Sequence, residues 1–344
     1  MPDDRTTVTE LGTALGMLRC AGPADALSRR PPELAIDGAA WERLSELHRS
    51  GCHRQEFAVA WANGRAFLEA PDALRGRPPM LVEWTGGRRP PGDEVAPVDL
   101  RVDHVYLVSC KYLSRLVANA SPARLFDGLL ATTGQWVTGD WYQEVAPEAY
   151  LQLYRECRAA TGLSQLPDDP GALDAAQRQQ LRRALGSARY PAGAAGAYQE
   201  LCRAVSARSA ERWRRNIHST TAAERLAWRL LRIGNAAYFV LGADERRPIR
   251  LRVASPWDWK QSYRLVSLDI EAAEAGQPQV RWTLDYRRRH DDTVGQVQGH
   301  VEVRWSHGRF AQPPEAKVYI DTSPYDLPGY FPIEGAADQP ALWE

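Results

Sequence analysis

The sequence predicts an α+β protein with three parts: an N-terminal α/β core, a helical middle segment and a C-terminal antiparallel β domain. Changes in the spacing of apolar residues lead to this expectation. The spacing is helical up to about residue 70, alternates from there to about residue 111, and after a second helical stretch alternates again from residue 236. We therefore expect the segments 1–135, 136–235 and 236–344.

The N-terminal segment begins with helices. Residues 1–50 have a weak helical pattern that glycine–proline and proline–proline pairs interrupt, and a clearer pattern spans residues 54–70 and ends before Pro71. Residues 80–84 then form a short strand. Residues 85–94 are rich in glycine and proline and are expected to form a loop.

Two alternating strands follow, in the sequence PVDLRVDHVYLVSCK. Their apolar residues share one face only if Val102 pairs with Tyr106, which leaves a three-residue turn between the strands. This register places Asp99, Ser109 and Lys111 together on the polar face. A two-residue turn would instead put Asp99 on the face opposite Lys111, so the turn length decides whether this polar cluster exists.

The remaining chain is first helical and then extended. Ser121 is expected to cap a helix that runs to about residue 130, because serine is a good N-cap and the proline after it favours the first helical position. Residues 140–233 are mostly helical, with an interruption at residues 193–196. From residue 236, six alternating stretches separated by turn residues predict a twisted antiparallel sheet.

An aspartate beside a lysine on one sheet face meets the minimum for metal-dependent cleavage of a phosphodiester. The metal ion generates hydroxide and neutralises charge on the phosphate, and a nearby cation stabilises the transition state. Magnesium binds acidic oxygens and takes only one or two carboxylates from the protein. We therefore expect Asp99 to hold Mg²⁺ or Mn²⁺, and Lys111 to orient the attacking water or stabilise the developing charge.

The order of these elements resembles the PD-(D/E)XK nuclease superfamily, which includes restriction endonucleases and many bacterial defence nucleases. The tripeptide Pro-Val-Asp that ends at Asp99 matches the first half of the motif, and Lys111 matches its lysine; the resemblance covers roughly residues 50–135. It implies a restriction-endonuclease-like core and metal-dependent hydrolysis of nucleic acid, with DNA as the expected substrate. It also places Glu56 where several members have an extra metal-binding acid.

The sequence departs from this motif at the second acid, which is expected two residues before the lysine and is Ser109 here. Serine is uncharged and a poor ligand for Mg²⁺. If the domain is an enzyme, another carboxylate must replace it, and Glu56, Glu83 and Asp103 are the candidates. Without a replacement, we expect a non-catalytic nucleic-acid-binding or scaffold subunit that keeps the fold and works with a protein partner. An unrelated β-rich domain that binds a small molecule is a third alternative.

A second Glu-x-Lys pair, Glu315 and Lys317, lies in the C-terminal strands after Glu302. No Pro-Asp precedes it, so it is expected to be a salt-bridged strand face unless it completes a composite site. Basic residues in two clusters are candidates for contact with the phosphates of nucleic acid. These are Arg214, Arg215, Arg287, Arg288 and Arg289.

The composition limits the other possibilities. The 43 basic and 43 acidic residues balance, so binding to nucleic acid must come from a local patch. The N-terminus lacks a signal-peptide pattern, no run is long and apolar enough for a membrane helix, and no cysteine pair has CxxC spacing, so we expect a cytoplasmic protein. The absence of Walker A, GxGxxG, GxSxG and clustered-histidine motifs argues against a P-loop NTPase, a dinucleotide enzyme, a serine hydrolase and a zinc enzyme.

Overall fold

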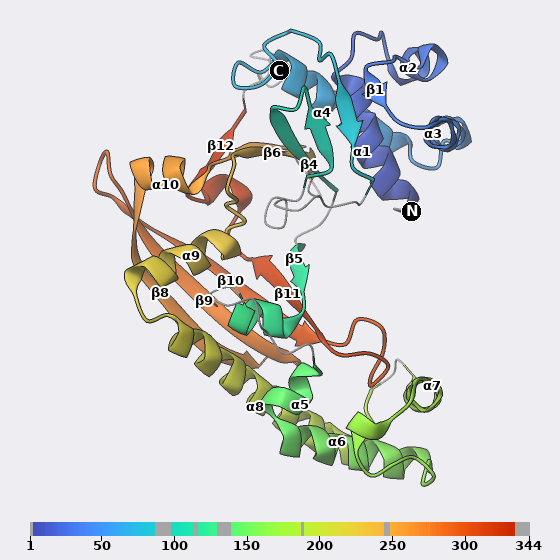
Figure 1. Cartoon of the computed structure of the whole chain (residues 1–344), viewed down its shortest axis with the longest axis vertical. Coiled ribbons are helices and arrows are strands. Elements are labelled where there is room, and N and C mark those ends of the chain that lie inside the picture. Colours follow the sequence, from blue (N-terminus) through green and yellow to red (C-terminus); the bar gives the residue numbers. More distant parts are fainter. Residues whose placement is uncertain are drawn as a thin grey trace, which may run out of the picture. The chain divides into compact units, whose positions relative to one another are not determined.

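The computed structural model confirms the α+β class, and its chain divides into two compact units (Figure 1). The structure describes residues 3–86, 98–112, 116–128, 139–186, 189–243, 248–274 and 276–333. Unit 1 comprises Met1–Ser114, Arg232–Tyr263 and Ser323–Glu344. Unit 2 comprises Arg115–Leu231 and Arg264–Thr322. Among the helices of the described ranges, none has the length and apolar character that a membrane crossing requires.

Unit 1 contains a seven-stranded mixed sheet with strand order β1-β2-β3-β4-β6-β7-β12. Its strands are β1 (Leu34–Ala35), β2 (Val82–Trp84), β3 (Leu100–Val102), β4 (Tyr106–Tyr112), β6 (Tyr238–Ala243), β7 (Pro248–Val253) and β12 (Tyr330–Pro332). Its helices are α1 (Asp4–Gly16), α2 (Pro23–Arg29), α3 (Gly38–Ser50), α4 (Arg54–Glu69), α10 (Pro256–Ser262) and the 3₁₀ turn η3 (Pro324–Asp326). The pairs β1–β2 and β4–β6 are parallel, and the other neighbours are antiparallel.

Helices α1 and α4 pack closely against each other because each has a glycine at the crossing. A Cβ added to Gly16 would lie 2.3 Å from the Trp61 carbonyl oxygen, and one added to Gly64 would lie 2.1 Å from the Thr13 carbonyl oxygen. Apolar residues of both helices join those of β2, β3, β4 and β6 in one core. The crossing therefore fixes α1 against the sheet.

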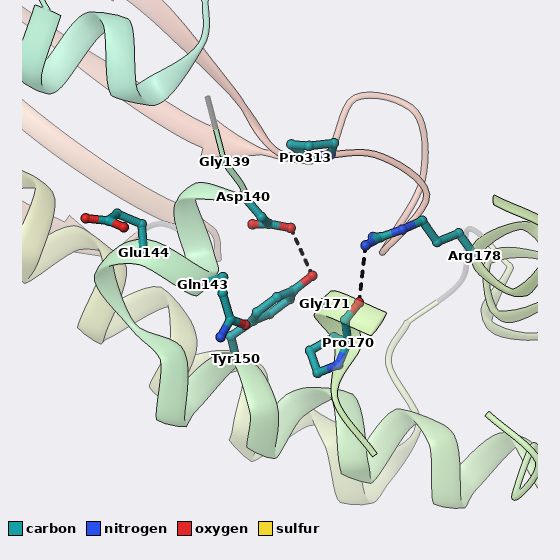
Figure 2. A pocket seen from close by; sticks show the side chains of 9 residues that line it. All are labelled: Gly139, Asp140, Gln143, Glu144, Tyr150, Pro170, Gly171, Arg178 and Pro313. Carbon is teal, nitrogen blue, oxygen red and sulfur yellow. Dashed lines mark hydrogen bonds between the residues drawn. The ribbon is translucent and has the colours of Figure 1, made fainter. Parts of the chain in front are cut away.

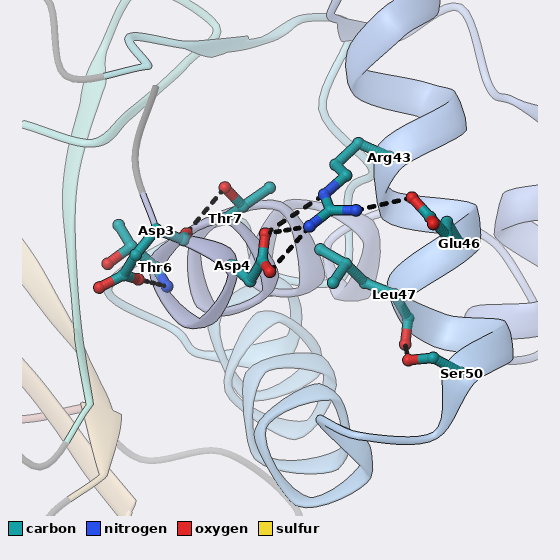
Figure 3. Close-up of polar contacts among 8 residues, drawn as sticks. All are labelled: Asp3, Asp4, Thr6, Thr7, Arg43, Glu46, Leu47 and Ser50. Atoms are coloured by element: carbon teal, nitrogen blue, oxygen red, sulfur yellow. Dashed lines mark hydrogen bonds and ion pairs between the residues drawn. The ribbon is translucent and has the colours of Figure 1, made fainter.

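The start of α1 is also tied to α3. Arg43 of α3 donates to both carboxylate oxygens of Asp4, at 2.7 and 2.8 Å, and to Glu46 at 2.6 Å (Figure 3). Asp3 caps α1 by accepting a hydrogen bond from the Thr6 amide at 2.7 Å. These contacts set where α1 begins, and so which of its side chains reach the sheet.

Unit 2 contains a five-stranded sheet with strand order β5-β11-β10-β9-β8. Its strands are β5 (Leu116–Ala120), β8 (Tyr263–Glu274), β9 (Pro278–Arg288), β10 (Val294–Arg304) and β11 (Glu315–Ile320). Its helices are α5 (Trp141–Val145), α6 (Pro147–Thr161), α7 (Ala175–Leu185), α8 (Ala192–Asn216), α9 (Thr220–Leu230), the π-helix η1 (Arg124–Gly128) and the 3₁₀ turn η2 (Pro170–Ala172). The long helix α8 runs along the sheet and packs against β9 (Figure 1).

The strands after residue 236 do not form the single antiparallel sheet that their spacing predicts. Strands β8 to β11 lie in the sheet of unit 2, whereas β6, β7 and β12 belong to unit 1, where β6 pairs in parallel with β4. Five of the six residues of β6 are buried. A strand buried on both faces has a continuous apolar run and suits the middle of a mixed sheet.

Two local predictions for unit 2 also need correction. The helix after Ser121 begins as predicted but continues as a π-helix at Arg124–Gly128. The interruption predicted at residues 193–196 is wrong, because α8 runs through it from Ala192 to Asn216. A glycine inside a helix costs only about 1 kcal/mol relative to alanine, and the buried face of this long helix outweighs that cost.

Candidate active site

The β3–β4 hairpin has the register that its apolar alternation predicts. Val102 pairs with Tyr106, which leaves a three-residue turn. Asp103 closes this turn: its Oδ1 accepts hydrogen bonds from the amide of Met80 at 2.8 Å and from the next amide at 2.9 Å. Asp103, a candidate for the second acid, therefore has a structural role in the turn of the hairpin. Lys111 lies near the other end of β4.

Asp99 lies one residue before β3, and its carboxylate reaches across to β4. The amide of Asp99 donates to the Val108 carbonyl oxygen at 2.8 Å. Its Oδ2 accepts hydrogen bonds from the Cys110 amide at 2.6 Å and from the Ser109 hydroxyl at 3.3 Å. Ser109 is completely buried. The residue that replaces the motif's second acid therefore helps to hold Asp99, directly beside the strand position of Lys111.

A second carboxylate comes from α1. Glu10 is only 6% exposed, and its Oε2 accepts a hydrogen bond from the indole Nε1 of Trp84 at 2.5 Å. Burial, with a further contribution from the negative charge of Asp99, raises the pKa of Glu10 to about 7, although the Trp84 hydrogen bond and the ammonium of Lys111 oppose the shift. The charges of Asp99 and Lys111 therefore both act on Glu10.

Sequence reasoning missed Glu10, although a signal was present. Glu10 is the only charged residue between Thr6 and Leu18, in a stretch otherwise made of apolar, small and hydroxyl side chains. All residues of α1 from Thr7 to Gly16 are buried. An isolated acid in a buried helix is rare without a specific partner, and this rarity marks it as a functional candidate.

The two glutamates that the sequence offers as replacement acids have other partners. Glu56, which is 8% exposed, pairs with Arg5 at 3.3 Å and lies 3.8 Å from His53. Glu83 pairs with His104 at 3.0 Å. The charges of Asp99 and Lys111 act on the pKa of Glu10.

The alternative pair in unit 2 is part of a salt-bridged strand face. Glu302 of β10 pairs in register with Lys317 of β11 and lies 3.3 Å from Arg304. The Nζ of Lys317 lies 3.8 Å from Glu315. These contacts agree with the structural interpretation of this Glu-x-Lys sequence.

The five arginines predicted to contact nucleic acid all lie in unit 2. Within that unit, Arg214 donates to the Ile270 carbonyl at 2.9 Å, Arg215 to Glu211 at 3.0 Å and Arg287 to Asp292 at 2.7 Å. Arg288 and Arg289 are exposed at the end of β9. Contact with phosphate remains a prediction for the whole set.

Unit 2 also has a hollow of about 450 Å³ beside α5 and α6 (Figure 2). Two of its polar side chains are hydrogen-bonded: the Tyr150 hydroxyl donates to Asp140 at 3.0 Å. Asp140 also caps α5, and Arg178 donates to the carbonyl oxygens of Pro170 and Phe310 at 3.2 and 3.1 Å. The groups in this hollow thus hold the fold of unit 2 together.

The candidate site offers few groups that could bind a metal ion. In the described ranges no group of three or more histidine, cysteine, aspartate and glutamate side chains is arranged to hold a metal ion. Asp99 and Glu10 offer two carboxylates. Two are sufficient for Mg²⁺, which keeps several of its waters.

No protein-family model, curated protein or solved structure matches the chain.

Proposed function

We propose that this chain is a metal-dependent phosphodiester hydrolase that acts on DNA, of the kind found in bacterial restriction and defence systems. The observation that carries the proposal is a buried Glu10, held by Trp84, whose pKa responds to the charges of Asp99 and Lys111, while Asp99 is bonded to β4 beside the strand position of Lys111. A buried acid with a raised pKa, coupled to a second acid and a lysine, is typical of a catalytic site rather than of a salt bridge at the surface.

The proposed roles follow from the chemistry of each group. Asp99 and Glu10 would hold Mg²⁺ or Mn²⁺, which when bound supplies a water-derived nucleophile and neutralises phosphate charge. Lys111 would orient the attacking water and stabilise the charge that develops on the phosphate. The Ser109 hydroxyl and the Cys110 amide hold the Asp99 carboxylate in place.

The order of elements supports the resemblance to PD-(D/E)XK nucleases over part of its length. Helix α4 precedes β2, Asp99 precedes β3, and Lys111 lies in β4. Beyond β4, however, the next described strand is β5 of unit 2, and the strand that pairs in parallel with β4 is β6. If the resemblance holds, unit 2 is therefore an insertion between two neighbouring strands of the core.

Cleavage of supercoiled plasmid DNA in Mg²⁺ or Mn²⁺ tests the proposal. We expect Asp99→Ala and Lys111→Ala each to slow cleavage at least about 100-fold, because each removes an interaction made in the transition state. Lys317→Ala is the matched control, since it removes a lysine from the salt-bridged face of unit 2, and it should cleave at the wild-type rate. Cleavage that survives both substitutions would exclude this site.

The alternative is a non-catalytic nucleic-acid-binding or scaffold subunit, and Ser109 in place of the second acid favours it. The same assay separates the two. DNA binding without cleavage in Mg²⁺ and in Mn²⁺ would support the alternative.

A further inference from the structure

The residues at the end of β2 contact the carboxylate of Glu10 and the backbone of Asp99. The indole Nε1 of Trp84 donates to Glu10 at 2.5 Å. The next residue, Thr85, donates to the carbonyl oxygen of Asp99 from its amide at 3.0 Å and from its hydroxyl at 3.2 Å. Trp84 also pairs in register with Leu100, the residue after Asp99. Trp84 at the end of β2 thus holds the Glu10 carboxylate, and Thr85, the residue after it, holds the Asp99 backbone.

Two carboxylates that share a site repel each other, so they remain close only if other groups restrain them. The backbone of Asp99 is held by Thr85, and its carboxylate is held by β4. Glu10 is on a different element and has a long side chain with several rotatable bonds. Without a donor, its carboxylate would be expected to turn away from Asp99.

We infer that Trp84 is a positioning residue that holds Glu10 in the orientation needed for both acids to bind one metal ion. The inference rests on the proposed function, since it assumes a divalent cation at Glu10 and Asp99. The role is specific to the indole N–H, because phenylalanine at this position retains an aromatic ring to pack against the core but has no donor. Trp84 packs against the hydrophobic core of unit 1, so the ring itself is needed for stability.

Isothermal titration of the full chain with Mn²⁺ tests this role. Replacing a residue that orients a metal ligand typically weakens metal affinity 10- to 100-fold, so we expect Trp84→Phe to weaken Mn²⁺ binding by about that factor. Trp257→Phe makes the same chemical change at an exposed side chain of α10 and should bind Mn²⁺ like the wild type. Thermal unfolding in EDTA checks that both variants are folded.

A double-mutant cycle separates positioning from a general effect on structure. If Trp84 acts through Glu10, then Trp84→Phe combined with Glu10→Gln should bind Mn²⁺ no more weakly than Glu10→Gln alone. Additive losses, or wild-type affinity in Trp84→Phe, would overturn the positioning role while leaving the proposed metal site intact. A wild-type chain that binds no Mn²⁺ would instead contradict the proposed function, and the role of Trp84 would fall with it.

Discussion

Glu10 connects the stability of unit 1 to its proposed chemistry. Its pKa rises from an ordinary value of 4.5 to about 7, mainly because α1 buries it. In the unfolded chain the same side chain is ionised above about pH 4.5, whereas in the folded chain it keeps its proton until about pH 7. The unfolded state therefore binds fewer protons in this interval, and stability falls as the pH rises through it.

The substitution Glu10→Gln should remove this loss of stability. A shift of this size corresponds to about 3 kcal/mol, so above pH 7 the variant is expected to be more stable than the wild type by up to about 3 kcal/mol. Below pH 4.5 the two should be nearly equal. Urea unfolding at pH 4 and pH 8 measures the difference.

Glu56→Gln provides the comparison at a second buried glutamate. Glu56 pairs with Arg5, so its neutralisation should give no gain at pH 8. A Glu10→Gln variant that is less stable than the wild type at pH 8 would contradict the claim that ionisation of Glu10 destabilises the folded chain.

The contact between α1 and α4 is the element-level feature on which the site depends, because it fixes the depth at which Glu10 meets the sheet. The two glycines at the crossing leave no room for a methyl group. Gly64→Ala should destabilise the fold by about 1–3 kcal/mol, since the new methyl group would force the Thr13 backbone away despite alanine's better helix propensity. Thermal unfolding measures this effect.

The matched control for that change is Gly38→Ala at the start of α3. A Cβ at Gly38 has no neighbour within 4 Å, so this variant should be as stable as the wild type or slightly more so. Equal stability of Gly64→Ala and Gly38→Ala would contradict this prediction, because it would show that α1 and α4 can move apart at their crossing without loss of stability.

Local elements could be predicted where one physical constraint dominated. The register of the β3–β4 hairpin follows from apolar alternation alone, because a slip of one residue would move one strand's apolar side chains to the opposite face of the sheet. The helix predicted for residues 54–70 appears as α4, because apolar residues recur there at helical spacing. Glu10 was not predicted because it comes from a helix about 90 residues before the hairpin, and only the packing of α1 brings it there.

The organisation of the whole molecule depends on pairings that no local pattern encodes. Strands β4 and β6 are neighbours in the sheet although the chain between them builds most of unit 2. The spacing of apolar residues indicates where strands occur but not which of them pair. The three consecutive segments expected from the sequence therefore differ from the two units of the structure, each of which is assembled from separate stretches of chain.

The central claim is that Glu10 supplies the second acid of a metal-dependent nuclease, and the rate of plasmid cleavage by Glu10→Gln in Mg²⁺ tests it most directly. We expect cleavage at least about 100-fold slower than in the wild type, in a protein that is at least as stable at pH 8. Cleavage by Glu10→Gln at the wild-type rate would contradict the claim.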